Sequence, residues 1–423
     1  MPEVVAIPGT HPFINSTWAV FLAVALLFPC ATEASDSSTG KVSLLHIGLA
    51  FLRPDHPDPV FLSDPKIDLT MVPAFEWVMD NDEIRRILRL YLPRNRQELA
   101  EYDLILIDGV DAMHLRAGFL NWVKELVQDS ELNFVMTDSG SGWAFAGSGT
   151  NWYITAIEPI LSVDDTPGRE AASPSFRANS FRIVPVDQEH ELMRNIPWEE
   201  VTWVAMNRPT ARPGSRVVAK MSGNRAVNVD KPCIVYFEYP GGGRSVSYIF
   251  TWHTMVDSPQ ILAFYRWRWH YDVLVHMIYW PAGETIPRDL MLVHDVREQI
   301  FNLRYSRLFL ISTMEFAERS GANLREVEEG LADLYDSEDR IDELYVENEM
   351  EECHELCLEL RFSYERLLEA ALDAKDRALL WVFVVEWAAV SGTSMAAGIL
   401  VWSLLVRRRL YRQVKTTRLR IDL

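Results

Sequence analysis

Two serines and a histidine have the residue types that nucleophilic catalysis needs. Ser139 and Ser141 alternate with Gly140 and Gly142 directly after one apolar segment, and His253 follows another. A serine hydroxyl becomes a nucleophile when a histidine accepts its proton, and glycine backbone amides hold the oxyanion that forms. These residues predict a hydrolase site if the two apolar segments end side by side.

A carboxylate must orient the histidine in such a site, and Asp138, Asp257 and Glu238 are the candidates. The turn departs from the Gly-x-Ser-x-Gly pattern that presents a nucleophilic serine, because position 139 is a serine rather than a glycine. In the alternative interpretation, the serines are turn residues and the domain binds a ligand without catalysis. The sequence favours this alternative.

Tryptophans flank both segments and favour a site that binds a sugar or a planar molecule. Trp143 follows the glycines, and Trp252 precedes His253. The predicted ligand-binding residues are Asp138, Gly140, Gly142, Trp143, Trp252 and His253. A second group, of three aromatic and two aliphatic residues, follows helical spacing and is predicted to be core instead. It comprises Phe264, Trp267, Tyr271, Leu274 and Ile278.

The histidines do not predict a metal site. His270 and His276 lack the i, i+4 spacing at which two histidines on a helix bind zinc, and no acidic residue adjoins either of them. We therefore predict neither a metal nor another cofactor.

Apolar runs that alternate with a helix pattern predict a parallel sheet. Runs at 42–48, 102–108 and 133–138 suit buried strands, and 115–128 has the apolar spacing of a crossover helix. Later strands are predicted at 181–185, 217–221, 233–239 and 245–252. Such a sheet carries helices on both faces and binds ligands beyond the carboxyl ends of its strands.

Several short motifs recur in a fixed order along this part of the chain. They lie at 102–108, 133–138, 139–142, 196–198, 232–239, 243–244, 252–253 and 280–283. Their order resembles the class I glutamine amidotransferase-like fold, and in particular its amidotransferase and trehalose-utilisation (ThuA-like) branches. The resemblance implies an α/β domain of the flavodoxin-like, three-layer type over residues 41–285.

The same resemblance implies that glutamine hydrolysis is absent. Amidotransferases carry a cysteine nucleophile on the turn that holds Ser139 here. The four cysteines of this chain are Cys30, Cys233, Cys353 and Cys357. His253 matches the family's histidine, but Thr254-Met255 follows it in place of the family's Pro-Glu pair. The domain is therefore expected to be a pseudoenzyme towards glutamine.

An acidic helical region is predicted at 287–377. Apolar residues recur there every three or four positions, with a break at 321–323, which is typical of a helical bundle or a coiled-coil stalk. The last apolar row contains Val346, Met350, Cys353, Cys357, Leu360, Tyr364, Leu367, Ala371 and Ala374. Cys353 and Cys357 are expected to be buried within this row, and an intermolecular disulfide is the alternative.

A C-terminal transmembrane helix is predicted at 379–406. The stretch is almost entirely apolar, its last 20 residues would span about 30 Å, and the basic tail 407–423 follows. Residues 1–34 have the apolar run and cleavage pattern of a signal peptide, with an uncleaved anchor as the alternative. Because basic tails stay in the cytoplasm, we predict a type I cell-membrane protein whose ectodomain lies outside.

Charge narrows the range of partners. The formal net charge is −19, and residues 315–376 contain 21 acidic against six basic side chains. This acidity argues against nucleic acid as a partner. The predicted partners are therefore the membrane, a small molecule or glycan, and a second copy of the chain.

A homodimer is predicted from the transmembrane helix and the helical region before it. Ala388, Gly392 and Ala396 lie four residues apart, a spacing that lets two helix backbones approach. The apolar row from Val346 to Ala374 would then be covered by the second chain. In the alternative, these helices fold back on each other within one chain.

Overall fold

The computed structural model describes residues 40–53, 56–75, 78–137, 152–164, 179–205, 210–223, 231–250 and 263–417. The chain divides into two compact units, Met1–Gly40 and Lys41–Leu423. All of the elements below belong to the second unit. The predicted signal peptide, 1–34, lies outside the described residues.

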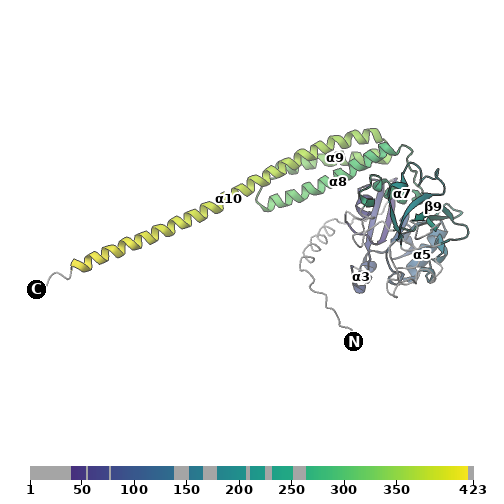
Figure 1. Ribbon diagram of the computed structural model, residues 1–423, viewed down its shortest axis with the longest axis horizontal. Coiled ribbons are helices and arrows are strands. Elements are labelled where there is room, and N and C mark those ends of the chain that lie inside the picture. The colour runs from purple at the N-terminus through teal and green to yellow at the C-terminus, as the bar shows by residue number, and fades with distance from the viewer. Residues whose placement is uncertain are drawn as a thin grey trace, which may run out of the picture. The chain divides into compact units, whose positions relative to one another are not determined.

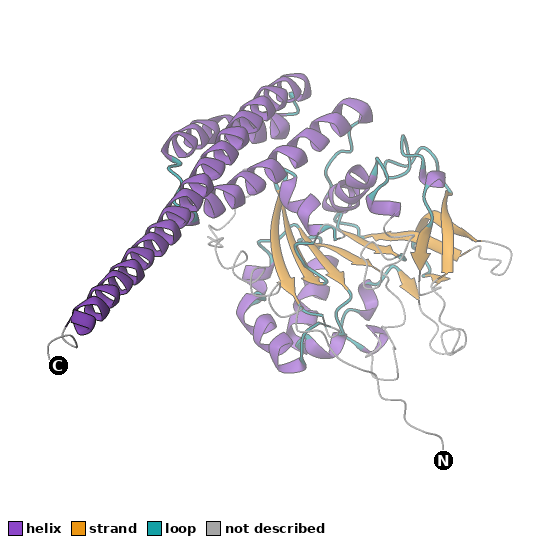
Figure 2. Ribbon diagram, turned by 60° about the vertical axis from the view of Figure 1, so that its left-hand side comes forward, coloured by secondary structure: helices purple, strands orange, loops and turns teal. Residues whose placement is uncertain are grey.

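One mixed sheet runs through the α/β part of the chain (Figure 2). Within the described residues its order is β2-β1-β3-β4-β11-β10-β9-β6-β7. The first five strands pair in parallel, and the other four join through antiparallel pairs. The predicted α/β class is confirmed.

Seven strands of the large sheet lie at the predicted apolar runs, whereas β2 and β7 were not predicted. The strands of the large sheet are β1 (Val42–Gly48), β2 (Ile67–Pro73), β3 (Leu104–Asp108), β4 (Asn133–Thr137), β6 (Asn179–Pro185), β7 (Trp203–Ala205), β9 (Arg216–Gly223), β10 (Lys231–Glu238) and β11 (Arg244–Tyr248). A separate small sheet pairs β5 (Val163–Asp164) with β8 (Thr210–Ala211). The glycine-rich turn between β10 and β11 closes a hairpin.

Helices cover both faces of the large sheet (Figure 2). They are α2 (Asp58–Ser63), α3 (Asn81–Tyr91), α4 (Arg96–Leu99), α5 (Ala117–Gln128) and α7 (His270–Ala282). Leu44 of β1 packs with α2 and α7 on one face, whereas Leu45 packs with α3 and α5 on the other. Because successive side chains point to opposite faces and both faces are buried, β1 is apolar along nearly its whole length.

The aromatic group before and within α7 is core, as its spacing predicts. Phe264, Trp267, Tyr271, Leu274 and Ile278 are all buried in the cluster between α7 and the sheet. Burial extends further around this helix than amphipathic spacing implies, because every residue from Tyr271 to Pro281 is buried. The α7 helix is therefore enclosed by protein on all sides.

Three long helices follow the α/β part and lie side by side (Figures 1 and 2). They are α8 (Leu290–Arg319), α9 (Arg325–Glu347) and α10 (Met350–Thr417). The chain turns at Gly321, whose positive φ of 81° suits glycine, in the predicted break between α8 and α9. Since α9 runs back along both neighbours, α8 and α10 point in the same direction.

The apolar row of α10 packs within the chain. Met350, Cys353, Cys357, Leu360 and Tyr364 are buried against α8 and α9 in a single hydrophobic cluster. Tyr364 also donates a hydrogen bond to Glu338 of α9. Helices of the same chain thus cover the row that a second chain was expected to cover, as in the fold-back alternative.

Beyond this bundle, α10 continues as an exposed apolar helix. Among the described residues one helix, Met350–Tyr411, is long and apolar enough to cross a membrane, and its apolar window is 0% buried in protein. Trp381, Trp387 and Trp402 are 69%, 59% and 68% exposed. A continuous apolar surface of this length is stable in lipid rather than in water, so membrane association is supported.

We expect Cys353 and Cys357 to resist a water-soluble maleimide in the folded, detergent-solubilised chain. Both thiols are buried, and their mutual hydrogen bond together with burial raises the pKa of Cys357. Labelling read by mass spectrometry should be about a hundredfold slower than at an added thiol in Glu365→Cys, an exposed site on the same helix. Equal rates in the folded chain would contradict the intrachain packing.

Candidate functional site

The carboxyl ends of the parallel strands form the edge at which a ligand is expected. Gly48 at the end of β1 pairs with Asp108 at the end of β3, and Thr137 of β4 pairs with Tyr248 of β11. The connections from β1 lead through α2 to β2 on one side, whereas β3 lies on its other side. Ligands of open α/β sheets bind at such a reversal of strand order.

The predicted site residues continue from two of these strands. Asp138, Ser139, Gly140, Ser141, Gly142, Trp143, Trp252 and His253 all lie outside the described residues, so their geometry stays a prediction. The structure does show that β4 and β11, the strands that precede them, are neighbours in the sheet.

Among the candidate orienting acids, Glu238 is the one that the structure describes. It ends β10 and pairs with Arg244, the first residue of β11, where the two side chains also form an ion pair at 3.6 Å. Because β10 and β11 are antiparallel, Glu238 lies at the edge opposite to Tyr248 and the segment beyond it. The other two candidate orienting acids, Asp138 and Asp257, lie outside the described residues.

A buried polar cluster lies beneath the carboxyl edge, and we call its residues His46, Asp58, Asp108 and Thr137 the His46 cluster. His46 of β1 donates from Nδ1 to Asp58 Oδ1 at 2.7 Å, and both side chains are 0% exposed. Asp58 also accepts from the backbone amide of Phe51 at 2.9 Å. The first residue of α2 is thereby tied to the middle of the sheet.

The second carboxylate of the cluster faces the other side of the imidazole. Asp108 Oδ2 lies 3.9 Å from His46 Nε2, and Thr137 donates its hydroxyl proton to Asp108. His46 Nε2 is buried and has no hydrogen-bond partner among the described residues. The cluster therefore connects β4, β3, β1 and α2. The imidazole lies between two acids, with Nδ1 on Asp58 and Nε2 facing Asp108.

Gly48 lets the ends of β1 and β3 approach each other closely above the cluster. A Cβ at Gly48 would lie 1.8 Å from the carbonyl oxygen of Asp108, and Gly48 has a φ of 120°. This approach lets the amide of Leu49 donate to the same carbonyl at 2.8 Å. Only glycine fits at this position, so the ends of β1 and β3 are fixed relative to each other.

Electrostatics favour a charged histidine in this cluster. Burial lowers the pKa of His46, but the neighbouring Asp58 and, more weakly, Asp108 outweigh it, so the pKa lies above its ordinary value. An imidazolium held between two carboxylates can release a proton beneath the site, and the neutral imidazole can take it up again. Because its side chains are buried, the cluster positions the strand ends rather than contacting solvent.

Sequence reasoning missed the His46 cluster. His46 stands in an apolar run and was assigned only to a buried strand, while Asp58 and Asp108 lie 12 and 62 positions away in the chain. The usable signal is that a histidine inside a strand buried on both faces needs a polar partner. The sequence does not say which of the many acids supplies it.

A second buried network joins the α/β part to the helical bundle. Arg297 of α8 donates to Asp272 of α7 at 2.9 Å and to Tyr345 of α9 at 2.8 Å. Tyr345 and Tyr279 in turn donate to the two oxygens of Asp64, at 3.0 and 2.5 Å. We call these five residues the Arg297 cluster, and its role is structural because every member is buried.

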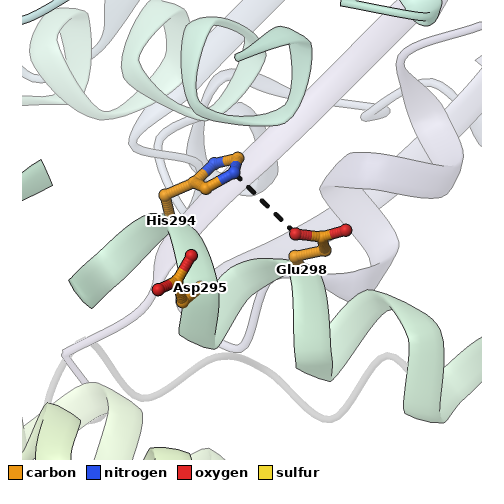
Figure 3. Close-up of side chains that lie close together, drawn as sticks. All are labelled: His294, Asp295 and Glu298. Carbon is orange, nitrogen blue, oxygen red and sulfur yellow. Dashed lines mark ion pairs between the residues drawn. The ribbon is translucent and has the colours of Figure 1, made fainter. Parts of the chain in front are cut away.

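Three side chains of α8 are close enough to share a metal ion (Figure 3). They are His294, Asp295 and Glu298. However, Arg268 donates from Nε to His294 Nε2 at 3.0 Å and lies 3.5 Å from Asp295. The guanidinium already uses the imidazole lone pair and balances the acids, so the geometry does not favour a metal here.

The described cysteines are unsuited to nucleophilic chemistry. Cys233 is 0% exposed inside β10, and burial raises its pKa well above the usual range.

When the sequence is compared with models of protein families and with curated proteins, no match is found.

We expect stability to depend on pH through His46. A histidine whose folded pKa is raised adds stability below its unfolded pKa of about 6.5, and this contribution is lost as pH rises through the folded value. Urea unfolding should therefore show the intact chain losing stability over that window relative to His46→Gln, by about 1.4 kcal/mol per unit of pKa shift.

The matched control is His354→Gln in α10, outside the cluster, which should keep the pH slope of the intact chain. If His46→Gln leaves the slope unchanged, the imidazole is not charged between Asp58 and Asp108.

Proposed function

We propose that this protein is a single-pass membrane protein whose α/β domain binds a small molecule or a glycan without hydrolysing glutamine. The binding site is the carboxyl edge where β1, β3, β4 and β11 end. The observation that carries the proposal is the His46 cluster. Its four buried polar side chains hold the strand ends at that edge in place. Buried polar groups at a strand-order reversal support a site better than they support packing alone.

The amidotransferase-like resemblance is retained as part of the proposal. The parallel strands follow the order 2-1-3-4-5 when β11 is counted as the fifth, which is the order of flavodoxin-like sheets. Helices on both faces support the three-layer arrangement. The absence of a cysteine at Ser139 and the burial of Cys233 argue against a thiolate nucleophile.

A serine- and histidine-dependent hydrolase is the second candidate. The pairing of β4 with β11 favours it, because Ser139 and Ser141 follow one of these strands and His253 follows the other. A nucleophile and its base need this kind of proximity. The first candidate is preferred because the turn departs from the pattern of serine nucleophiles.

We further propose a type I orientation in the cell membrane. Arg407, Arg408 and Arg409 directly follow the exposed apolar part of α10, and such clusters stay in the cytoplasm. The α/β domain and the acidic bundle would then lie outside the cytoplasm.

Protease added to intact cells should remove the ectodomain and leave a small membrane-bound fragment. The basic cluster holds the tail inside, so replacing all three arginines by Glu should reduce the cleaved fraction. The matched control is the triple Lys variant, which keeps the charge and should behave as the intact chain. Full protection of the ectodomain in intact cells would overturn the type I orientation.

Ligand binding is tested on the full chain in lipid nanodiscs by thermal shift against panels of sugars and small metabolites. A ligand at 100 times its Kd should stabilise the fold by about 2.7 kcal/mol. Asp108→Asn should weaken the stabilisation, whereas Asp129→Asn, at the opposite edge of the sheet, should not. No ligand-induced shift with either panel would count against the binding proposal.

A fluorophosphonate probe separates the two candidates in the same preparation. Labelling of Ser139 or Ser141 that is lost in His253→Ala would establish the hydrolase instead. Ammonia release from glutamine that depends on Cys233 would refute both candidates.

A further inference from the structure

Helix α8 has apolar side chains on two opposite faces, and the bundle covers only one of them. Leu303 and Leu310 are buried against α9 and α10. On the opposite face Tyr305, Phe309 and Phe316 are 66%, 51% and 54% exposed. With Ser312 these residues have the 4-3-4 spacing of a coiled-coil row. We call Tyr305, Phe309, Ser312 and Phe316 the α8 stripe.

The α8 stripe is free of charge in a strongly acidic region. Between positions 299 and 316 the charged residues are Arg304, Arg307 and Glu315, none of which is in the stripe itself. The two arginines form ion pairs with Asp342 and Glu338 of α9, and Glu315 lies 3.8 Å from Arg319 of the same helix. Residues 315–376, by contrast, carry 21 acids against six bases. Two copies of this bundle would repel each other through their acidic faces. They could approach each other through the stripe without this repulsion.

The direction of the helices limits what covers the stripe. The pairs Arg304–Asp342 and Arg307–Glu338 show that α9 runs antiparallel to α8, and Tyr364–Glu338 ties α10 to the same level. Since α8 is parallel to α10 and α10 is the membrane helix, the stripe runs along the membrane normal. A lipid surface would therefore reach its end rather than its length.

We propose that the α8 stripe is the contact surface of a parallel homodimer, in which the α8 helices of two copies pack on each other. The anchor sets the stripe at the same height in every copy, so a two-fold axis along the membrane normal pairs each ring with its own symmetry mate. The centres of such interfaces are enriched in aromatic residues and depleted of charged residues. This inference depends on membrane anchoring but not on the ligand site.

The available area predicts a weak dimer that the membrane strengthens. An aromatic side chain buries about 150–250 Å² in full, so the three half-exposed rings with Leu308 offer about 400–500 Å² per chain. Two copies would bury about 900 Å², below the about 1,200 Å² of stable complexes. Confinement of both copies to one membrane raises their effective concentration and compensates for the small area.

This arrangement excludes the dimer predicted from the small residues of the membrane helix. Each α8 would stand between the two α10 helices, and packed helix axes lie about 8–10 Å apart. Gly392 of one copy would then be too far from Gly392 of the other for contact. The two dimers are therefore distinguishable by crosslinking.

The test uses the full chain in liposomes with single cysteines at Tyr305→Cys, Phe309→Cys and Phe316→Cys. Mild oxidation should give disulfide-linked dimers at all three positions. Glu365→Cys, an exposed site on α10 outside the stripe, and Gly392→Cys, in the membrane segment, should give none. The unsubstituted chain measures any contribution of the native cysteines.

A second variant keeps the test independent of cysteine chemistry at the rings. Adding Phe309→Glu to Phe316→Cys should lower the crosslinked fraction about tenfold or more. The helix content should not change, because Phe309 is exposed. Crosslinking at Gly392 alone, equal crosslinking at Glu365, products with other proteins, or no dimer at any stripe position would each overturn the proposal.

Discussion

The architecture depends on a single buried guanidinium. Arg297 is 1% exposed, and removing such a charge from water costs several kcal/mol unless its partners are in place. Asp272, Tyr345 and His276 supply them at 2.9, 2.8 and 3.2 Å. The partners come from α7 and α9, so Nε and Nη1 of the guanidinium are hydrogen-bonded only when the helical bundle is docked on the α/β domain, whereas the buried Nη2 has no hydrogen-bond partner among the described residues.

The neighbours of Arg297 have protonation states that suit it. Burial, and then the guanidinium itself, lower the pKa of His276 to about 3, so its neutral Nε2 accepts a hydrogen bond. The pKa of Asp272 is lowered despite burial, because His294 and Arg297 hold its charged form. A buried cation thus meets a carboxylate and a neutral imidazole, and specificity of docking follows from their geometry.

The sequence predicts the elements of this structure better than it predicts their contacts. Strands such as 42–48 and the helix break near Gly321 follow from apolar period and turn residues, which are local properties. Arg297 stands between the apolar positions 296 and 300 and reads as an ordinary surface residue, yet it is buried by partners 25 and 48 positions away. His46 is a similar case, since its acids come from separate elements.

The apolar row of α10 shows the same limit in another form. The apolar row that contains Cys353 and Cys357 predicts that this face of the helix is covered. The apolar period alone does not distinguish a second chain from a returning helix of the same chain. The turn at Gly321 decides in favour of the returning helix. The sequence alone does not distinguish the α8 stripe, because Tyr305, Phe309 and Phe316 lie among residues whose inward apolar spacing already accounts for a helix.

One short helix connects the two buried clusters. Asp58 at the first residue of α2 binds His46, and Asp64, directly after its last residue, binds Tyr279 and Tyr345. Six helical residues span only about 9 Å. The candidate ligand edge and the docking surface of the bundle are therefore held by opposite ends of one rigid segment.

The bundle in turn includes the first part of α10, which runs as one helix from Met350 to Thr417. A tilt or rotation of the membrane segment would move the row that packs on α8 and α9, because no turn interrupts the helix. Arg297 connects those helices to α7, and Asp64 connects them to α2. The geometry of the candidate site is thus physically continuous with the candidate membrane segment of α10 through packed and hydrogen-bonded groups.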